Sequence, residues 1–214
     1  MKILVTGSTG LVGSALIPSL KSKGHQVVRL VRSTPKEGAA EVYWNPEDGS
    51  LNATELEGID AAVHLAGENL AEGRWTEEKK RRIRESRVKG TRLLSQKIAK
   101  LLKMPEVLVS ASAVGFYGDR GEEVLTEQSA SGSDFLAEVC REWELATQAA
   151  SQAGVRVVNL RFGVILSGEG GALRKMMLPF KIGVGGKLGS GRQYMSWITI
   201  DDAVGAIEFA LENE

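Results

Sequence analysis

The chain has 214 residues, of which 43% are hydrophobic and 25% are charged, and its formal net charge is zero. This length and composition fit one sizeable globular core with a small second lobe, and a net charge of zero gives no long-range attraction to nucleic acid or to acidic membranes. One cysteine and two histidines exclude an internal disulfide and are too few for a structural zinc site, so we predict no bound metal.

The chain opens on an apolar strand at residues 2–6, with no signal-peptide pattern before it. No apolar stretch approaches the length of a membrane span. We therefore expect a cytoplasmic protein. A helix follows the strand at residues 11–23 and ends at Gly24. Pro18 removes a hydrogen bond from its interior, so either the helix kinks there or the predicted boundary is wrong.

Between this strand and helix lies a glycine-rich turn with the sequence T-G-S-T-G-L-V-G. In α/β proteins, a strand followed by a tight turn and the start of a helix presents backbone N–H groups to the pyrophosphate of a dinucleotide. The spacing G-x-x-G-x-x-G is one residue longer than the common fingerprint, and the alternative is a glycine-rich turn without a ligand. The predicted contact residues are Gly7, Thr9, Gly10, Leu11, Val12 and Gly13.

The second strand, at residues 26–32, ends in Val31-Arg32 and is followed by Ser33. An acidic residue here would bind the ribose hydroxyls of NAD, but none is present. Arg32 suits a 2′-phosphate, and the hydroxyl of Ser33 adds a donor. The sequence therefore favours NADP over NAD. The alternative is an arginine that merely ends a strand in solvent.

Short strands are predicted at residues 42–44 and 61–65, and the second of them ends in Leu65-Ala66-Gly67. These three residues would lie where ligands of open α/β sheets bind, although Gly67 equally suits helix–sheet packing. A charged helix is predicted at residues 76–102 with Thr76 as its N-cap. Its basic run includes Arg82 and is interleaved with glutamates, which indicates a solvated face. Arg82, five residues before Arg87, is also expected to share the cofactor edge with it. Gly90 and Thr91 suit close packing near a cofactor beside Arg87.

The strand at residues 106–112 carries Ser110 and Ser112 at its carboxyl end, and Tyr117 follows in a loop. A serine hydroxyl in this place suits binding of a substrate oxygen, and Ser110 is also expected to contact the cofactor. Next come a helix from Ser133 or Asp134 to near Gly154 and a strand at residues 155–166.

Residues 167–193 are rich in glycine and are predicted to be a loop-rich substrate-side region, within which Met176, Leu178 and Phe180 can still be buried. A short strand at residues 197–200 and a helix starting at Asp201 or Asp202 close the chain. The alternation of strands and helices predicts an α/β protein with a Rossmann doubly wound parallel sheet. We assign residues 1–166 to an NADP-binding domain and residues 167–214 to a partial substrate-side region.

Several motifs together resemble the extended short-chain dehydrogenase/reductases, in particular the nucleotide-sugar epimerase-like subgroup of unsettled substrate. The motifs are T-G-S-T-G-L-V-G, H-L-A-G-E-N, S-R-V-K-G-T, S-A-S-A-V-G-F-Y-G, L-R-F-G-V-I-L and W-I-T-I-D-D, with D-F-L-A-E-V-C-R-E-W-E and M-L-P-F between them. The resemblance covers essentially the whole chain. Chains of this family continue into a longer substrate-binding lobe, so the resemblance implies that the C-terminal lobe is incomplete here.

The resemblance implies a pyrophosphate on Gly7, Gly10 and Gly13, with Ile165 near the nicotinamide. It also implies contacts of the cofactor with Leu65, Ala66 and Arg87, and an adenosine 2′-phosphate at Val31 and Arg32. We expect Gln193 and Trp197 to line the substrate side. The implied activity is that of an NADP-dependent oxidoreductase or epimerase, which transfers hydride to and from a nucleotide-sugar-like small molecule. Family members often pair through two long helices, so we expect a monomer or a homodimer.

The chain departs from the family at the catalytic Tyr-x-x-x-Lys pair. A lysine four residues after a tyrosine stabilises the phenolate, so that the tyrosine acts as a base. In this chain no tyrosine has such a lysine, and Leu136 and Cys140 stand at the matching helix positions. The candidates for catalysis are then Ser112 and Tyr117, with Arg120 lowering the pKa of the tyrosine.

The alternative function is a non-catalytic NADP-binding sensor or interaction protein, which the missing pair favours. A P-loop hydrolase is excluded because no lysine follows the glycine turn. An α/β-hydrolase is excluded because the chain has no G-x-S-x-G motif and no histidine late in the sequence.

Overall fold

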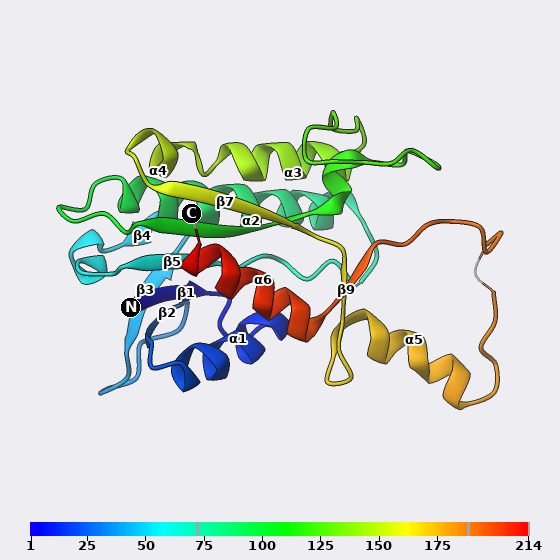
Figure 1. Cartoon of the computed structure of the whole chain (residues 1–214), viewed down its shortest axis with the longest axis horizontal. Coiled ribbons are helices and arrows are strands. Elements are labelled where there is room, and N and C mark those ends of the chain that lie inside the picture. The colour runs from blue at the N-terminus through cyan, green and yellow to red at the C-terminus, as the bar shows by residue number, and fades with distance from the viewer. Residues whose placement is uncertain (72, 188, 214) are drawn as a thin grey trace.

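A computed structural model describes residues 1–71, 73–187 and 189–213 and places a mostly parallel sheet between two layers of helices (Figure 1). The sheet order is β4-β3-β2-β1-β5-β6-β7, with β4 antiparallel to β3 and the other pairs parallel. The strands are β1 (Lys2–Thr6), β2 (Gln26–Val31), β3 (Glu41–Asn45), β4 (Ser50–Leu51), β5 (Ala61–His64), β6 (Val107–Ala113) and β7 (Arg156–Phe162). This order confirms the predicted Rossmann fold.

The helices cover both faces of the sheet. One face carries α2 (Glu77–Ile98), α3 (Phe135–Leu145) and α4 (Gln148–Gln152), and the other carries α1 (Leu11–Ser22) and α6 (Ile200–Glu212) (Figure 1). Alternate residues of a strand point to opposite faces. Leu4 of β1 therefore packs with Leu94 of α2, whereas Ile3 of the same strand packs with Leu16 of α1 and Ile207 of α6. The central strands are buried on both sides, which explains their continuous apolar sequences.

Strands β1 and β5 are neighbours in the sheet, although β2, β3 and β4 lie between them in sequence. The order of the strands therefore reverses at this point. The strands after β1 extend the sheet in one direction, and those from β5 onward extend it in the other. The connections after β1 and β5 therefore diverge to opposite faces and leave a crevice at their carboxyl ends, where open α/β sheets bind ligands.

Two predicted elements are each divided in the structure. The strand expected at residues 155–166 is β7 and β8 (Val164–Leu166), which belong to different sheets. The chain breaks at Gly163, where a Cβ atom would lie 2.7 Å from the carbonyl oxygen of Ser196. The helix expected to end near Gly154 is α3 and α4, separated at Ala146 and Thr147.

Other predicted boundaries need smaller corrections. Helix α1 continues through Pro18 to Ser22, and the chain ends the helix before Gly24, which has φ of +82°. Helix α2 ends at Ile98, earlier than expected. Three short elements were not predicted: β4, the 3₁₀ helix η1 (Ala53–Leu56) and the 3₁₀ helix η2 (Val114–Tyr117).

Beyond the carboxyl ends of the strands lies a smaller unit. Strand β8 pairs in parallel with β9 (Trp197–Thr199), and α5 (Gly171–Lys181) lies between them in sequence and projects from the molecule (Figure 1). The expected burial of Met176, Leu178 and Phe180 is wrong, because α5 buries no side chain. Since α6 then packs back onto the main sheet, the region after residue 166 contributes to both parts of the molecule. The division into two domains stays a prediction.

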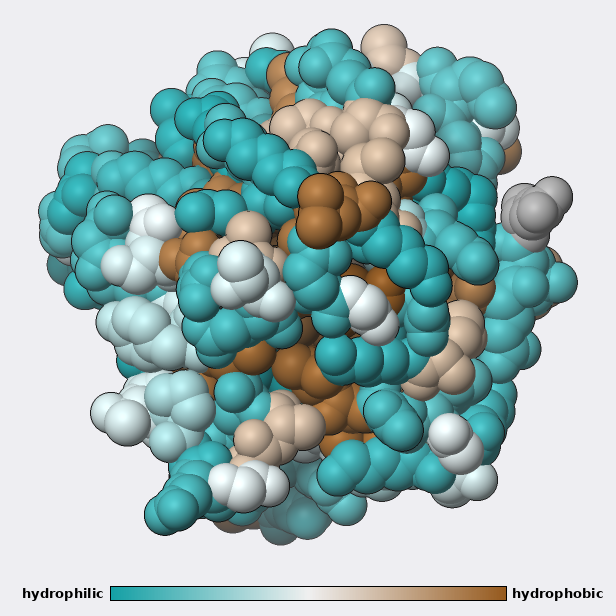
Figure 2. All heavy atoms as spheres, turned by 90° about the vertical axis from the view of Figure 1, so that its left-hand side faces the viewer, coloured by the Kyte–Doolittle hydropathy of each residue, from teal (hydrophilic) through white to brown (hydrophobic). Residues whose placement is uncertain are grey.

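The end of the molecule away from α5 faces the viewer in Figure 2. Its surface is mainly hydrophilic, with small groups of hydrophobic residues between the polar ones. In the part of the chain that the structure describes, no helix combines the length and the apolar character needed to span a bilayer.

Candidate functional site

The turn after β1 has the tight geometry that its glycines predict. Gly7 has φ of +67°, and a Cβ atom on it would lie 2.7 Å from the carbonyl carbon of Leu65. A Cβ atom on Gly13 would lie 2.3 Å from the carbonyl oxygen of Gly7, so helix α1 starts in direct contact with the turn. At these two positions no side chain fits. Gly10 is different, because its φ of −77° is an ordinary value and its Cβ atom would have only one close neighbour, at 3.3 Å.

The amino terminus of α1 suits an anion. Gly10 is the N-cap, and because it has no side chain no cap hydrogen bond covers the first N–H groups of the helix. The first turn contains no acidic residue. The unpaired amides and the positive end of the helix dipole therefore face outward together, as a pyrophosphate site requires. Thr9 beside them is exposed, and Leu11 lies against the start of α5 at Gly171.

A buried network that the sequence did not reveal fixes the loop after β5. The Thr6 hydroxyl accepts hydrogen bonds from the N–H groups of Leu65 (3.1 Å) and Ala66 (3.2 Å) and lies 2.8 Å from Nδ1 of His64. Because the hydroxyl oxygen already accepts from two backbone N–H groups, it donates its own proton to Nδ1. We therefore assign the ring proton of the neutral histidine to Nε2. Burial lowers the pKa of His64 to about 4, so the ring is neutral. The network holds Leu65 and Ala66 beside the glycine turn.

Arg87, a residue of helix α2, binds the same loop through a hydrogen bond. Its guanidinium donates to the carbonyl oxygens of Ile83 (3.2 Å) and Glu68 (3.1 Å), and it lies over the ring of Trp143, 5.1 Å from its centroid. A Cβ atom on Gly67 would lie 3.3 Å from this guanidinium. Gly67 therefore allows the close approach of Arg87. Burial lowers the pKa of Arg87, yet the guanidinium stays charged at neutral pH.

The cationic residues expected near the adenosine ribose lie around one carboxylate. Arg32 and Ser33 are exposed after β2, and Val31 is the last residue of that strand. Nε of Arg82 lies 3.7 Å from Oε1 of Glu68. The hydrogen bond from Lys79, together with the charges of Arg82 and Arg32, lowers the pKa of the Glu68 carboxyl. Residues from β2, α2 and the loop after β5 thus meet at one place.

Ser112 and Tyr117, the expected catalytic residues, belong to a second polar network. The Ser112 hydroxyl donates to Oε1 of Glu144 at 2.6 Å, and Arg161 binds both oxygens of that carboxylate at 2.8 Å. Arg161 also donates to the Tyr117 hydroxyl at 2.9 Å and stacks on Phe116, 3.5 Å from the ring centroid. The bond to Glu144 raises the pKa of Arg161, which stays charged.

This network corrects the expectation for Arg120 and shows how Ser112 is held. The hydroxyl of Ser112 is donated to Glu144, and the residue is 3% exposed, so its catalytic role stays a prediction. The cation that contacts Tyr117 is Arg161, whereas Arg120 binds Glu123 and the carbonyl oxygen of Ala130. Ser110 is fully buried, with its hydroxyl 3.3 Å from the carbonyl oxygen of Ala111.

The position of the family's Tyr-x-x-x-Lys pair is apolar. Leu136 and Cys140 lie on the face of α3 that contacts η2, where a Cβ atom on Gly115 would meet them at 3.5 Å and 3.9 Å. Burial raises the pKa of the Cys140 thiol to about 11, so the thiol is protonated at neutral pH. Neither residue supplies a base.

The residues expected near the nicotinamide and the substrate lie on the small sheet and its loop. Ile165 is in β8, in register with Ile198 of β9. Trp197 starts β9 and lines a hollow of about 310 Å³ together with Gly163 and Arg161. Gln193 precedes this strand, 3.4 Å from the hydroxyl of Ser190. The structure therefore places Trp197 and Ile165 on adjacent strands.

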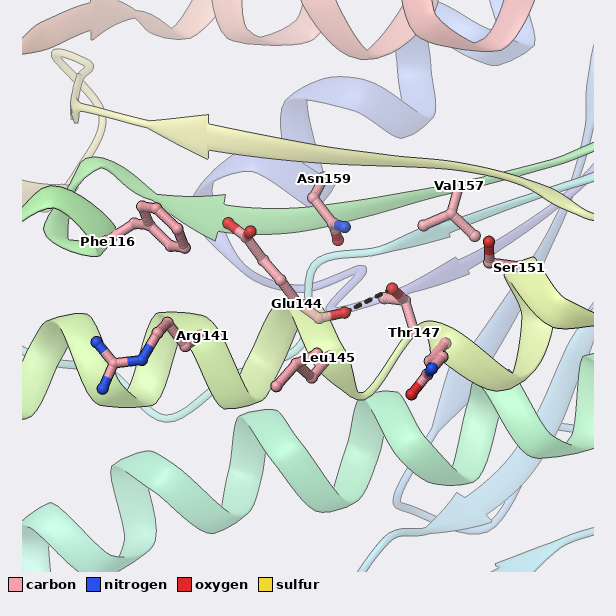
Figure 3. A pocket seen from close by; sticks show the side chains of 9 residues that line it. Phe116, Arg141, Glu144, Leu145, Thr147, Ser151, Val157 and Asn159 are labelled. Atoms are coloured by element: carbon pink, nitrogen blue, oxygen red, sulfur yellow. Dashed lines mark hydrogen bonds between the residues drawn. The ribbon is translucent and has the colours of Figure 1, made fainter. Parts of the chain in front are cut away.

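A larger pocket of about 500 Å³ lies between β7 and the break from α3 to α4 (Figure 3). Its lining includes Phe116, Glu144 and Asn159, and none of the expected cofactor residues. Figure 3 shows the Glu144 carboxylate turned toward β6 and β7 while its backbone carbonyl accepts from the Thr147 hydroxyl. In the described residues, no group of histidine, cysteine and acidic side chains is placed to hold a metal ion.

Comparison with known proteins extends this picture. The model of the NAD dependent epimerase/dehydratase family matches residues 3–214. An epimerase family protein of Mycobacterium bovis is 44% identical over 209 residues, which are 98% of this chain and 68% of that protein. An epimerase family protein of Bacillus subtilis is 42% identical over 217 residues, with 100% and 71% coverage.

Two solved structures are also similar. A nucleoside-diphosphate sugar epimerase from Corynebacterium glutamicum has 45% identity and a TM-score of 0.86 over 99% of this chain, which spans less than half of that protein at 43%. A human epimerase family protein solved with NADPH has 36% identity and a TM-score of 0.88, with 99% and 70% coverage.

Proposed function

Since the chain belongs to the NAD dependent epimerase/dehydratase family, we propose that it binds NADP and catalyses hydride transfer on a nucleotide-sugar-like substrate. The observation that carries the proposal is the open amino terminus of α1 behind the turn at Gly7, Gly10 and Gly13. This arrangement fits a pyrophosphate, because unpaired amides and the positive end of the helix dipole attract the anion. The glycine at the N-cap has no side chain that would block its approach. A bound nicotinamide supplies the hydride donor and acceptor.

The preference for NADP rests on charge. Arg32 and Arg82 are exposed cations near the predicted adenosine ribose, and β2 is not followed by an acidic residue that would bind a 2′-hydroxyl. Arginine binds a phosphate with two parallel hydrogen bonds. The human relative solved with NADPH, at 36% identity, supports the same assignment.

The substrate class is proposed from the small sheet and from one relative. Trp197, the first residue of β9, is 58% exposed, and Gln193 lies in the loop before it, so a flat ring system has an aromatic surface to contact. The similar protein from Corynebacterium glutamicum is described as a nucleoside-diphosphate sugar epimerase. We assign the substrate side to these residues.

The geometry gives the residues of the second network a positioning role. Glu144 and Arg161 hold the hydroxyls of Ser112 and Tyr117, which ties β6, η2, α3 and β7 together at the edge of the sheet where the substrate would lie. The Ser112 hydroxyl donates its proton to Glu144, whereas the Tyr117 hydroxyl accepts from Arg161, so proton transfer by either residue stays a prediction. The proposed function rests on the cofactor site.

The proposal is tested by calorimetric titration with NADPH and NADH, with the Arg32→Ala variant beside the parent protein. We expect a clear preference for NADPH, which the variant weakens by about tenfold to a hundredfold, because it loses charge-assisted bonds to the 2′-phosphate. NADH affinity should change much less.

Arg120→Ala is the matched control, since it removes the same charge from the exposed loop after η2. It should leave both affinities unchanged. Absence of binding of either nucleotide to the parent protein would contradict the proposal. Equal loss of NADPH and NADH affinity in Arg32→Ala would contradict the assignment of Arg32 to the 2′-phosphate.

A further inference from the structure

Glu68 is a carboxylate surrounded by cations at the predicted adenosine end of the cofactor site. Nζ of Lys79 lies 2.8 Å from its Oε1, and Nε of Arg82 lies 3.7 Å from the same atom. The charge of Arg32, at the end of β2, also reaches this carboxyl and helps to lower its pKa. Lys79 and Arg82 of α2 thus contact one carboxylate, and the charge of Arg32, after β2, also acts on it.

The position of Glu68 is fixed by its backbone. Its N–H donates to the Ser86 hydroxyl at 3.0 Å, and its carbonyl accepts from Arg87 at 3.1 Å. Both partners are on α2, so the residue cannot swing away from the helix without breaking two hydrogen bonds. The carboxylate is thereby held one residue after Gly67, in the loop that is predicted to contact the cofactor.

Lys79 is unusual for a lysine because its side chain is only 6% exposed. A buried ammonium needs a counter-ion, and Glu68 provides one. Arg82, in contrast, is 54% exposed at its side chain, and Arg32 is exposed as well, so both can turn toward an incoming anion. Glu68 therefore has one buried partner that keeps it in place and two exposed cationic neighbours that can also bind a phosphate.

We propose that Glu68 determines how strongly the site discriminates NADPH from NADH, by competing with the 2′-phosphate for Arg32 and Arg82. The inference rests on the NADP site proposed above. A 2′-phosphate brings up to two negative charges next to the carboxylate and is repelled by it. A 2′-hydroxyl instead can donate a hydrogen bond to a carboxylate. Glu68 thus weakens NADPH binding and supports NADH binding, while Lys79 limits both effects by neutralising the carboxylate.

The test compares the dissociation constants of NADPH and NADH in the parent protein and in Glu68→Gln, with adenosine 2′,5′-bisphosphate and 5′-AMP as probes of the adenosine end alone. Glutamine keeps the size of the side chain and removes its charge. We expect the preference for the 2′-phosphate to rise by about tenfold with both pairs of ligands, and to shrink again at high salt.

Two further variants control the interpretation. Glu85→Gln removes the same charge from α2, where the carboxylate pairs with Arg81 and Lys89, and it should leave the preference unchanged. Lys79→Gln releases the Glu68 carboxylate from its buried partner and should lower the preference for the 2′-phosphate. The folded state of each variant is checked by its melting temperature.

The outcomes separate the two proposals. A parent protein that binds neither nucleotide overturns the proposed function. If the parent protein binds NADPH but Glu68→Gln has the same preference for NADPH over NADH as the parent, the NADP site stands and the role of Glu68 is overturned. The same conclusion follows if Glu68→Gln and Glu85→Gln have equal preferences. A rise in Glu68→Gln with a fall in Lys79→Gln supports it.

Discussion

His64 links the stability of the protein to pH. The ring is fully buried, its Nδ1 is bound by the Thr6 hydroxyl, and its edge lies against Trp44 at a centroid distance of 5.9 Å. Its folded-state pKa is about 4, compared with an ordinary value of 6.5. As the pH falls through 6.5, the unfolded chain takes up a proton that the folded protein cannot bind until about pH 4. Stability is therefore full above pH 6.5 and falls between these two values.

We predict that protonation of His64 in the unfolded chain lowers the free energy of unfolding by about 2 kcal/mol when the pH is lowered from 7 to 5. Urea unfolding at the two pH values measures the loss. His64→Asn keeps polar atoms near Thr6 but does not titrate, so its loss should be smaller by that amount. His25→Asn changes the other histidine, in the turn before β2, and should keep the full loss. An unchanged pH dependence in His64→Asn would contradict the assignment.

Single residues also mark where sequence analysis succeeds and where it fails. The glycine turn was predictable because the conformation of Gly7 and the contacts of Gly13 allow no side chain, which leaves a pattern in the sequence. The hydrogen bond between Thr6 and His64 was not predictable, because it joins residues 58 positions apart and leaves no local pattern in the sequence. Glu68 looked like a loop residue until the structure placed Lys79 and Arg82 beside it.

At the scale of elements, helices α2 and α4 are joined by one buried hydroxyl. Ser95 of α2 donates to the carbonyl oxygen of Thr147 at 3.0 Å and accepts from the N–H of Ala150 at 2.8 Å. The Ser95 side chain is fully buried, so water cannot replace these bonds. The bridge fixes the break between α3 and α4, and therefore the place of Glu144 just before it.

We predict that Ser95→Ala lowers the free energy of unfolding by about 1–2 kcal/mol, because it leaves buried backbone groups with fewer partners. Urea unfolding gives the value, and hydrogen exchange should show faster opening of α4. Ser22→Ala is the control, since that hydroxyl binds the carbonyl oxygen of Ser19 on the exposed end of α1 and should change stability by less than about 0.5 kcal/mol. Equal effects of the two substitutions would refute the bridging role.

Element boundaries depended on tertiary contacts that the sequence does not display. The apolar run after residue 155 has one strand pattern, yet Gly163 breaks it because the chain leaves the main sheet and meets Ser196. Helix α5 was missed because glycines surround it and Pro179 lies within it. Elements with strong local signals were placed well, such as β1 and the N-cap at Thr76, whose side chain accepts from the N–H of Lys79.

At the scale of the whole molecule, the strand order brings the candidate cofactor residues together. Gly7 follows β1, Arg32 follows β2 and Leu65 follows β5, and these three strands are neighbours at the centre of the sheet. Their residues are up to about 60 positions apart, yet they share one edge because parallel strands end on the same side. The alternation of strands and helices was enough to predict this edge. It was not enough to predict the side-chain networks of Glu68 and Glu144, which depend on how α2 and α3 lie on the sheet.

In the proposed function, the turn after β1 holds the pyrophosphate of a nicotinamide dinucleotide. The variant Gly10→Ala isolates this contact, because the backbone of Gly10 has an ordinary φ of −77° and a Cβ atom would press only on the carbonyl oxygen of Gly7 at 3.3 Å. The variant should therefore fold with a melting temperature close to that of the parent, while its new methyl group stands where the phosphates approach.

The measurement is a calorimetric titration of both proteins with NADPH. We predict binding to the parent and a loss of affinity of at least about tenfold in Gly10→Ala, since displaced phosphates lose their charge-assisted bonds to the first amides of α1. Equal NADPH affinity in the two folded proteins would contradict the claim that the cofactor lies on this turn.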